Sequence, residues 1–287
     1  MSQNLQDNGR EARQLEGFAW VADRLAAMEP AEIAFRVGEQ WKRTASRSFH
    51  PPAARLVTGP MEDCPALPGL ADGLATLADE TDLRRNWRRL AEQMRQGRFQ
   101  ALGTTWPDHP GPPNWHLDPS TQTTWPRDPY CFDIPYRYAP ERGDIKFVHE
   151  LNRLQYLQPM AAVAALDDDA DLVDLVVQHL DSWMASNPPY RGMAWLSGIE
   201  LALRLVSLLV VSTLIGDRAF SPEFRQRLQH CLAAHGYWLA RYPSRFSSAN
   251  NHRIAEAGGL YLLGHLVPTL RQARKWARES KEVLETE

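Results

Sequence analysis

The chain has 287 residues, of which 44% are hydrophobic and 23% are charged. These fractions are ordinary for a folded protein and suffice for a sizeable core in one or two domains. A formal net charge of −3 gives no electrostatic case for nucleic acid as a partner. The three cysteines and nine histidines show no metal-ligand spacing, so we expect neither a disulfide framework, nor a metal, nor a cofactor.

The N-terminal part predicts two helices and a proline-rich linker. Between residues 14 and 46, apolar residues recur at helical spacing in two runs, which are Phe18, Val21, Leu25 and Met28, then Ile33, Val37 and Trp41. Residues 50–68 are irregular and rich in proline. We therefore expect a helical leader and linker over residues 1–68 and the main domain over 69–287. No apolar run typical of a signal peptide is visible near the N-terminus, which favours a cytoplasmic location by default.

The next two segments differ in character. Residues 83–98 predict an amphipathic basic helix whose arginines form a solvated face. Residues 103–143 form a long connection rich in proline, tryptophan, tyrosine and aspartate. Connections of this length are usually functional or disordered, and the aromatic content argues against disorder. We expect an ordered loop that lies across a cleft.

From Asp144 onward the pattern is helix after helix. The predicted helices are 144–166, 170–187, 195–215, 221–241, 249–265 and 268–285. Their spacing predicts antiparallel helix pairs, and the pattern alone leaves open whether the pairs surround a centre or stack in a row. The most apolar stretch, 201–215, contains an arginine and is expected to be too short to span a membrane.

The most distinctive stretch is 247–256, which reads Ser-Ser-Ala-Asn-Asn-His-Arg-Ile-Ala-Glu. On a helix, His252 and Glu256 share one face, because they are four residues apart. Such a dense set of polar groups is costly to bury unless the groups serve one another or a ligand. The alternative is structural: Ser247, Ser248 or Asn250 caps a helix, and His252 packs against it.

Several short blocks occur in a fixed order along the chain. They cover residues 115–119, 125–126, 133–137, 143–146, 149–153, 187–188, 195–204, 248–252 and 256–260. In these blocks the sequence resembles the heparinase II/III-type polysaccharide lyases, in their N-terminal helical domain. The resemblance implies an all-α fold, an incomplete α/α toroid of antiparallel helix pairs, without the family's C-terminal β-sheet domain. It also implies that the catalytic tyrosine expected after the Asn-Asn-His segment is missing here, since no tyrosine follows Tyr261. We therefore expect a truncated lyase.

The chemistry that the resemblance implies is β-elimination at a uronic acid. A base removes the proton on C5, and donors stabilise the enolate charge on the carboxylate. An asparagine amide is such a donor, and a histidine can act as donor or base. The expected catalytic residues are Asn251 and His252. The expected substrate-binding residues are Trp115, Tyr136, Arg137, Glu150, Asn152, Arg153, Trp195, Glu200, Arg204, Asn250 and Glu256.

Other interpretations stay open. Glu200 and Arg204, four residues apart on an apolar helix, favour a buried structural ion pair. The chain could be a non-catalytic sugar-binding or assembly module. An inverting glycosidase needs two carboxylates across a cleft, and the candidates are Glu150, Glu200 and Asp144. The expected partner is an acidic polysaccharide, such as a glycosaminoglycan or alginate. Without a β-domain, we also expect an exposed apolar face near residues 221–285 and self-association through it.

Overall fold

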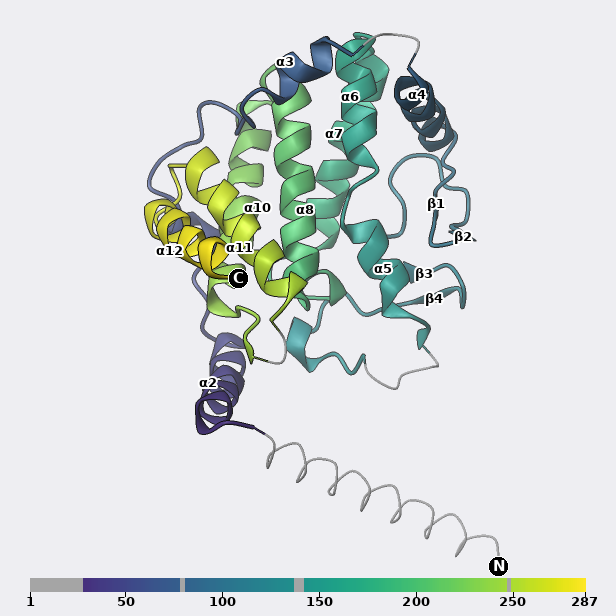
Figure 1. Cartoon of the computed structure of the whole chain (residues 1–287). Helices are drawn as coiled ribbons and strands as arrows, with labels where there is room; N and C mark the ends of the chain where they lie inside the picture. Colours follow the sequence, from purple (N-terminus) through teal and green to yellow (C-terminus); the bar gives the residue numbers. More distant parts are fainter. Residues whose placement is uncertain (1–27, 78–80, 137–141, 247–248) are drawn as a thin grey trace, which may run out of the picture. The chain divides into compact units, whose positions relative to one another are not determined.

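The computed structural model describes residues 28–77, 81–136, 142–246 and 249–287 (Figure 1). The chain divides into two compact units, Met1–His50 and Pro51–Glu287. In the first unit, helix α2 (Pro30–Ser46) begins with a proline, whose missing N–H costs no helical hydrogen bond at that position. The helix predicted from Phe18 to Met28 lies outside the described residues, apart from Met28.

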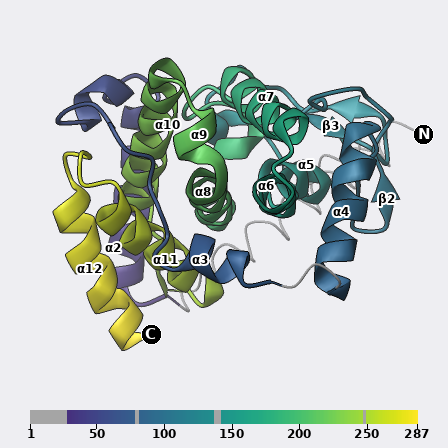
Figure 2. The ribbon, with the colours of Figure 1, turned by 90° about the horizontal axis from the view of Figure 1, so that it is seen from above.

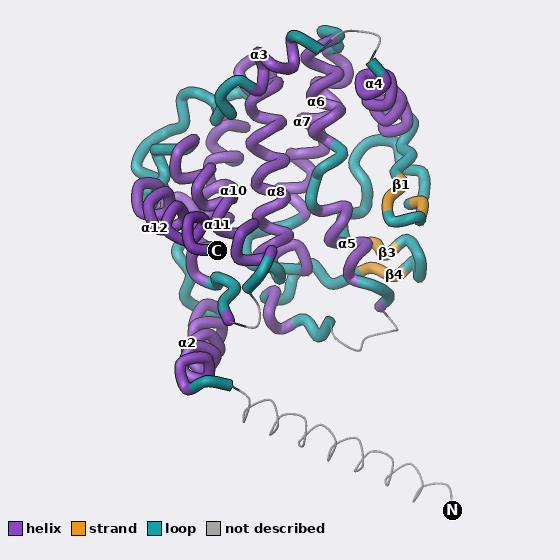
Figure 3. Tube along the Cα trace, viewed as in Figure 1, coloured by secondary structure: helices purple, strands orange, loops and turns teal. Residues whose placement is uncertain are grey.

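The second unit is built from helices. They are α3 (Leu70–Ala75), α4 (Asp82–Arg95), α5 (Ile145–Asn152), α6 (Leu157–Leu166), α7 (Ala170–Ser186), α8 (Gly198–Val211), α9 (Asp217–Ala219), α10 (Pro222–Arg241), α11 (Asn251–Leu266) and α12 (Ala273–Thr286). The described strands form two small antiparallel ribbons, drawn in orange in Figure 3. One joins β1 (Gln100–Ala101) to β2 (Thr104–Thr105), and the other joins β3 (Leu117–Asp118) to β4 (Thr123–Thr124). The prediction of an all-α fold is confirmed.

The helices of the second unit pair in chain order. Contacts join α6 to α7, α8 to α10 and α11 to α12, while α8 also contacts both α6 and α11. Figures 1 and 2 show the resulting arc, with α4 at one edge, α8 in the middle and α12 at the other edge. Each helix buries its apolar face against its neighbours, so one continuous core runs through the pairs.

Two predicted helices differ from those observed. The predicted helix 144–166 is broken into α5 and α6, because Leu154 takes a left-handed conformation with φ of 57°. Helix α8 continues through a π-helical turn (Ser212–Gly216) into α9, and the whole helix Gly198–Ala219 has 22 residues. The expectation that this stretch is too short for a membrane is wrong on length. However, its most apolar part is 61% buried inside the protein, as is usual for a core helix.

The proline-rich segment after His50 belongs to the second unit. The Thr58 amide donates to the Thr269 carbonyl, and the Arg271 amide donates to the Leu56 carbonyl, both at 2.8 Å. Leu67 is also held, because its amide donates to Thr213 Oγ1 at 2.9 Å. The structure therefore divides the chain at His50, whereas the sequence grouped residues 51–68 with the leader.

The basic helix α4 is fixed to the turn between α6 and α7. Arg84 and Arg88 both donate to the carboxylate of Asp167, at 2.9 Å and 2.6–2.7 Å, and Arg95 pairs with Asp169. The hydrogen bonds from Arg88, with those from Arg84, lower the pKa of Asp167 to about 2. The expectation of a merely solvated basic face is wrong for these three arginines, because the acidic turn sequence supplies their partners.

The long connection after β1 is packed against the helices by its tryptophans. Trp106, Trp115 and Trp125 are all buried. Asp118 is also buried; it accepts hydrogen bonds from the amide of Ser120 and from that of Asp144, the N-cap residue of α5. These contacts explain why the described part of this loop is ordered. Its position at the mouth of a cleft stays a prediction.

Candidate functional site

The first turn of α8 lies between the ends of two other helices that carry predicted site residues. Glu200, in this turn, is hydrogen-bonded to Arg153 at the end of α5. Gly198, the first residue of α8, lies against Glu256 of α11; a Cβ built on Gly198 would be 2.1 Å from Glu256 Oε1. The end of α5 and the starts of α8 and α11 therefore meet in one region, which we call the helix-end site.

Arg153 connects two carboxylates in this site. Its Nε and one terminal nitrogen donate to the two oxygens of Glu200, at 2.6 Å and 3.0 Å. The other terminal nitrogen donates to Glu150 Oε2 at 2.6 Å. Burial alone would raise the pKa of Glu200, but the hydrogen bonds from Arg153 outweigh it and the pKa is lowered. Glu200 is therefore an anion at neutral pH.

The predicted ion pair between Glu200 and Arg204 is wrong. Arg204 is fully buried, and its guanidinium donates to the carbonyls of Asn152 and Ala194 and to His235 Nε2. It also stacks on Trp183, 4.5 Å from the ring centre. Burial lowers the pKa of Arg204 to about 10, which still leaves it charged. Carbonyl dipoles thus take the place of the expected carboxylate.

Three other residues expected to bind substrate also lie in the core. The Asn152 amide donates to the carbonyls of Trp115 and Val148, and its oxygen accepts from Trp183 Nε1. The indole nitrogens of Trp115 and Trp195 are hydrogen-bonded to Ser182 and to the Asn187 carbonyl. Like Arg204, these side chains are at most 2% exposed. All four side chains are therefore buried and hydrogen-bonded to other parts of the protein.

The Asn-Asn-His segment lies at the start of α11. Asn250 occupies the N-cap position, but its side chain makes no capping hydrogen bond. Asn250 and Asn251 are exposed, and His252 is half-buried. The alternative that Asn250 caps the helix through its side chain is therefore not what the structure shows, and Ser247 and Ser248 lie outside the described residues. The first turn of α11 presents an amide and an imidazole that a ligand can reach.

The remaining predicted residues divide between surface and core. Glu150 and Arg153 keep 22% and 27% of their side-chain surface exposed, so a ligand can reach both. Tyr136 is half-buried against the small cluster that contains Trp125 and Met193. Arg137 lies outside the described residues. Glu256 is buried and accepts two hydrogen bonds from Ser244.

Sequence reasoning missed three residues of this region. His149 lies beside Glu200, with 3.8 Å between its Nδ1 and the Glu200 carboxylate, and burial lowers its pKa. Ser244 donates hydrogen bonds to Glu256, and Gly198 leaves space for its carboxylate. His149 and Gly198 lie in the sequence blocks quoted above, but nothing local indicates that Gly198 and Ser244 would meet the same glutamate. Within the described residues, no group of three or more histidines, cysteines or acidic residues is placed to hold a metal ion.

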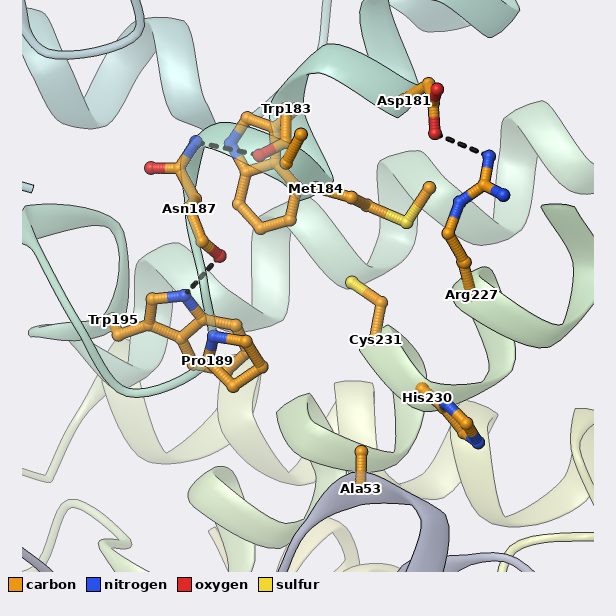
Figure 4. Close-up of a pocket in the computed structure, with 11 residues that line it drawn as sticks. Ala53, Asp181, Trp183, Met184, Asn187, Pro189, Trp195, Arg227, His230 and Cys231 are labelled. Atoms are coloured by element: carbon orange, nitrogen blue, oxygen red, sulfur yellow. Dashed lines mark hydrogen bonds and ion pairs between the residues drawn. The ribbon is translucent and has the colours of Figure 1, made fainter. Parts of the chain in front are cut away.

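A hollow lies between α7 and α10 (Figure 4). It has a volume of about 250 Å³, and Met184, Pro189 and Trp195 form part of its apolar wall. Asp181 and Arg227 at its edge pair with one another at 2.6 Å. Burial raises the pKa of the Cys231 thiol to about 12, so this thiol is no nucleophile at neutral pH. The hollow offers apolar contact and no evident chemistry.

An apolar face near residues 221–285 stays a prediction. Among the described residues between 221 and 285, Phe246, Ile254 and Leu284 are large hydrophobic side chains exposed to solvent. Ile254 follows His252 on α11 by two positions. Self-association through this face stays a prediction.

The sequence of this chain is similar to that of a known protein family. The sequence model of the family described as Heparinase II/III N-terminus matches residues 114–287. The chain belongs to this family. The match spans more than half of the chain and includes α5, α8 and α11, whose ends form the helix-end site. No curated protein matches the chain.

Solved structures agree on the fold. The crystal structure of heparan sulfate lyase HepC from Pedobacter heparinus is similar with a TM-score of 0.50 and 19% identity, over 88% of this chain and 34% of that one. The heparinase III-BT4657 gene product with methylated lysines is similar with a TM-score of 0.52 and 15% identity, over 83% of this chain and 40% of that one. The incomplete α/α toroid predicted from the resemblance is confirmed. This chain spans 34–40% of the length of these structures.

Proposed function

We propose that this chain binds an acidic polysaccharide that contains uronic acid, and that Asn251 and His252 take part in its cleavage by β-elimination. The observation that carries the proposal is the exposed start of α11. There, the Asn251 amide and the His252 imidazole lie at the positive end of a 16-residue helix, where free backbone N–H groups favour an anion. A uronate carboxylate is such an anion.

The proposed roles follow from the reaction. A base takes the proton from C5, a double bond forms between C4 and C5, and the bond from C4 to the leaving oxygen breaks. The leaving oxygen then takes up a proton. While the C5 proton leaves, negative charge develops on the uronate carboxylate, and donors fixed in advance stabilise that charge. Asn251 serves as such a donor, because its amide keeps its protons at working pH. His252 serves as a second donor or as the base.

The cluster around Arg153 suits the neutral parts of the sugar. Glu150, Arg153 and Glu200 together carry one net negative charge, so they repel a carboxylate more than they attract it. The reachable oxygens of Glu150 can accept hydrogen bonds from sugar hydroxyls. We therefore assign Glu150 and Arg153 to hydroxyl contacts, and we assign the carboxylate to the start of α11.

Two other functions remain to be compared with these observations. An inverting glycosidase needs a carboxylic acid of raised pKa, and the lowered pKa of Glu200 disfavours that role. A non-catalytic binding module would bind the same acidic oligosaccharide and release no product. The acid that protonates the leaving oxygen is not assigned to any described residue. The proposed elimination therefore needs an acid in addition to Asn251 and His252.

The experiment compares oligosaccharides of matched length. Calorimetry measures the binding of a glycosaminoglycan oligosaccharide, an alginate oligosaccharide and a neutral cello-oligosaccharide. We expect an acidic oligosaccharide to bind and the neutral one not to bind. Ultraviolet absorbance of the unsaturated uronide then reports elimination. Equal binding of the neutral sugar, or new reducing ends without that absorbance, would contradict the proposal.

A further inference from the structure

Glu256 holds the chain segment that leads into α11. Its two carboxylate oxygens accept hydrogen bonds from the amide and the hydroxyl of Ser244, each at 2.7 Å. Ser244 is the third residue after α10, and Glu256 lies in the second turn of α11. The glutamate therefore joins the two ends of the connection between these helices. Only 3% of Glu256 is exposed, so this arrangement lies beneath the surface.

The buried carboxylate requires a glycine in the neighbouring helix. A Cβ on Gly198 would lie 2.1 Å from Glu256 Oε1 and 2.8 Å from its carboxyl carbon. Real carbon atoms do not approach so closely, so any larger residue there would displace the glutamate. Gly198 begins α8, whose positive end is a favourable place for a carboxylate. The absence of a side chain at Gly198 therefore lets the Glu256 carboxylate of α11 pack against the start of α8.

Two residues of the connection between α10 and α11 have strained backbone conformations. Phe246 has φ of 55°, and Asn250 has φ of 63° with ψ of −142°. The second conformation is one that residues other than glycine rarely adopt. Such a conformation is strained, and it persists only when surrounding contacts impose it. Asn250 directly precedes the proposed catalytic pair, so this strain lies at the proposed site.

We propose that Glu256 is a positioning residue and that it does not bind substrate. Through Ser244, with the space that Gly198 provides, it sets the conformation of the described residues 244–246 and 249–250 and so the direction of Asn251 and His252. The part of this proposal that concerns substrate rests on the proposed function. The part that concerns the conformation of the connection does not.

The primary test is amide hydrogen exchange, which needs no ligand. In Glu256→Ala and in Gly198→Ala, we expect the hydrogen-bonded amides of Ser244, Ala249, Arg253 and Ile254 to exchange about tenfold faster or more, while those of α7 keep their rates. Gly258→Ala is the matched control, because nothing lies within 4 Å of a Cβ built there. Ser244→Ala removes only the hydroxyl bond and should give an intermediate rate. Glu256→Gln, which keeps an acceptor oxygen, should restore most of the protection.

Two results would overturn the proposal. One is unchanged exchange at the amides of Ser244, Ala249, Arg253 and Ile254 in both main variants. The other is an equal increase in all helices of the second unit, which would indicate general destabilisation. If Glu256→Ala does not fold, Gly198→Ala and Ser244→Ala carry the same comparison.

A binding cycle then tests the link to the substrate. Glu256→Ala should weaken binding of the acidic oligosaccharide about tenfold or more, but should add no further loss in the Asn251→Ala background, because both changes act on one contact. A purely structural role would give additive losses, and additive losses would overturn the positioning role. If the unaltered protein binds no uronate, the proposed function fails, while the exchange experiment still decides what Glu256 does.

Discussion

Arg153 and Glu200 join the end of α5 to the first turn of α8 through two hydrogen bonds, of 2.6 Å and 3.0 Å. A planar guanidinium matches a carboxylate in this way, whereas a lysine cannot. The pair is mostly buried, with 27% of the arginine side chain and 9% of the glutamate side chain exposed. It therefore fixes the distance between two helices that border the proposed site.

Arg153→Met should lower the free energy of unfolding by about 2–3 kcal/mol, because it leaves the buried Glu200 carboxylate without its partner. Urea denaturation measures this change. The control is Lys275→Met, which removes an exposed pair to Glu279 and should cost less than about 0.5 kcal/mol. Equal losses in the two variants would show that the pair between Arg153 and Glu200 contributes no more than a surface contact.

The buried histidine next to Arg204 predicts a dependence of stability on pH. His235 Nδ1 donates to the Cys231 carbonyl and its Nε2 accepts from Arg204, so the ring is neutral. Burial lowers its pKa from 6.5 to about 3. Between these values the unfolded chain binds a proton that the folded chain does not, so stability falls as pH falls. The contribution is about 1.4 kcal/mol per pH unit.

The variant that checks this is His235→Gln, which keeps an acceptor for Arg204 but has no titrating group. The free energy of unfolding, measured from pH 7 to pH 4, should fall less steeply in this variant. His179, whose pKa burial lowers to about 4, should produce part of the remaining slope. An identical slope in the variant and the unaltered protein would contradict a neutral buried His235.

A third prediction concerns the docking of α4. Asp167 accepts from two arginines of this helix, and its pKa is lowered from 3.8 to about 2 by those hydrogen bonds. The stabilisation is therefore complete above pH 3.8 and is lost as pH falls through about 2. Asp167→Asn should increase hydrogen exchange in α4 at pH 7. The neighbouring Asp168→Asn should not, because 95% of its side chain is exposed. An equal increase in both variants would mean that Asp167 does not hold α4.

The helices could be predicted from apolar periodicity because most of them bury one face. The predicted helix 170–187 is observed as α7 (Ala170–Ser186), and 221–241 as α10 (Pro222–Arg241). The break at Leu154 could not be predicted, since periodicity continues through it and a leucine rarely takes a positive φ. The long-range pairs that attach α4 were also missed, because the arginines and aspartates lie far apart in the sequence.

The candidate site could be predicted only in part. The Asn-Asn-His segment is distinctive in sequence, and the structure places Asn251 on the surface at the start of α11. The spacing of four residues predicted an ion pair between Glu200 and Arg204. In the structure, the carboxylate of Glu200 instead accepts hydrogen bonds from Arg153 at the end of α5. Asn152 and Trp195 were predicted to bind substrate because polar and aromatic side chains are common in binding sites. Their burial depends on packing between helices, which local sequence does not encode.

One substitution tests the proposed contact between Asn251 and a uronate carboxylate at the start of α11. Asn251→Ala should weaken binding of an acidic oligosaccharide by about tenfold or more, since a hydrogen bond to a charged group contributes about 1.5–3 kcal/mol. In an active enzyme that contains this chain, turnover should fall by a factor on the order of 10²–10³, as for one lost oxyanion donor. The melting temperature should stay nearly unchanged, because Asn251 is exposed. Intact oligosaccharide binding, together with a loss of stability above about 1 kcal/mol, the usual cost of a lost helix cap, would contradict the account.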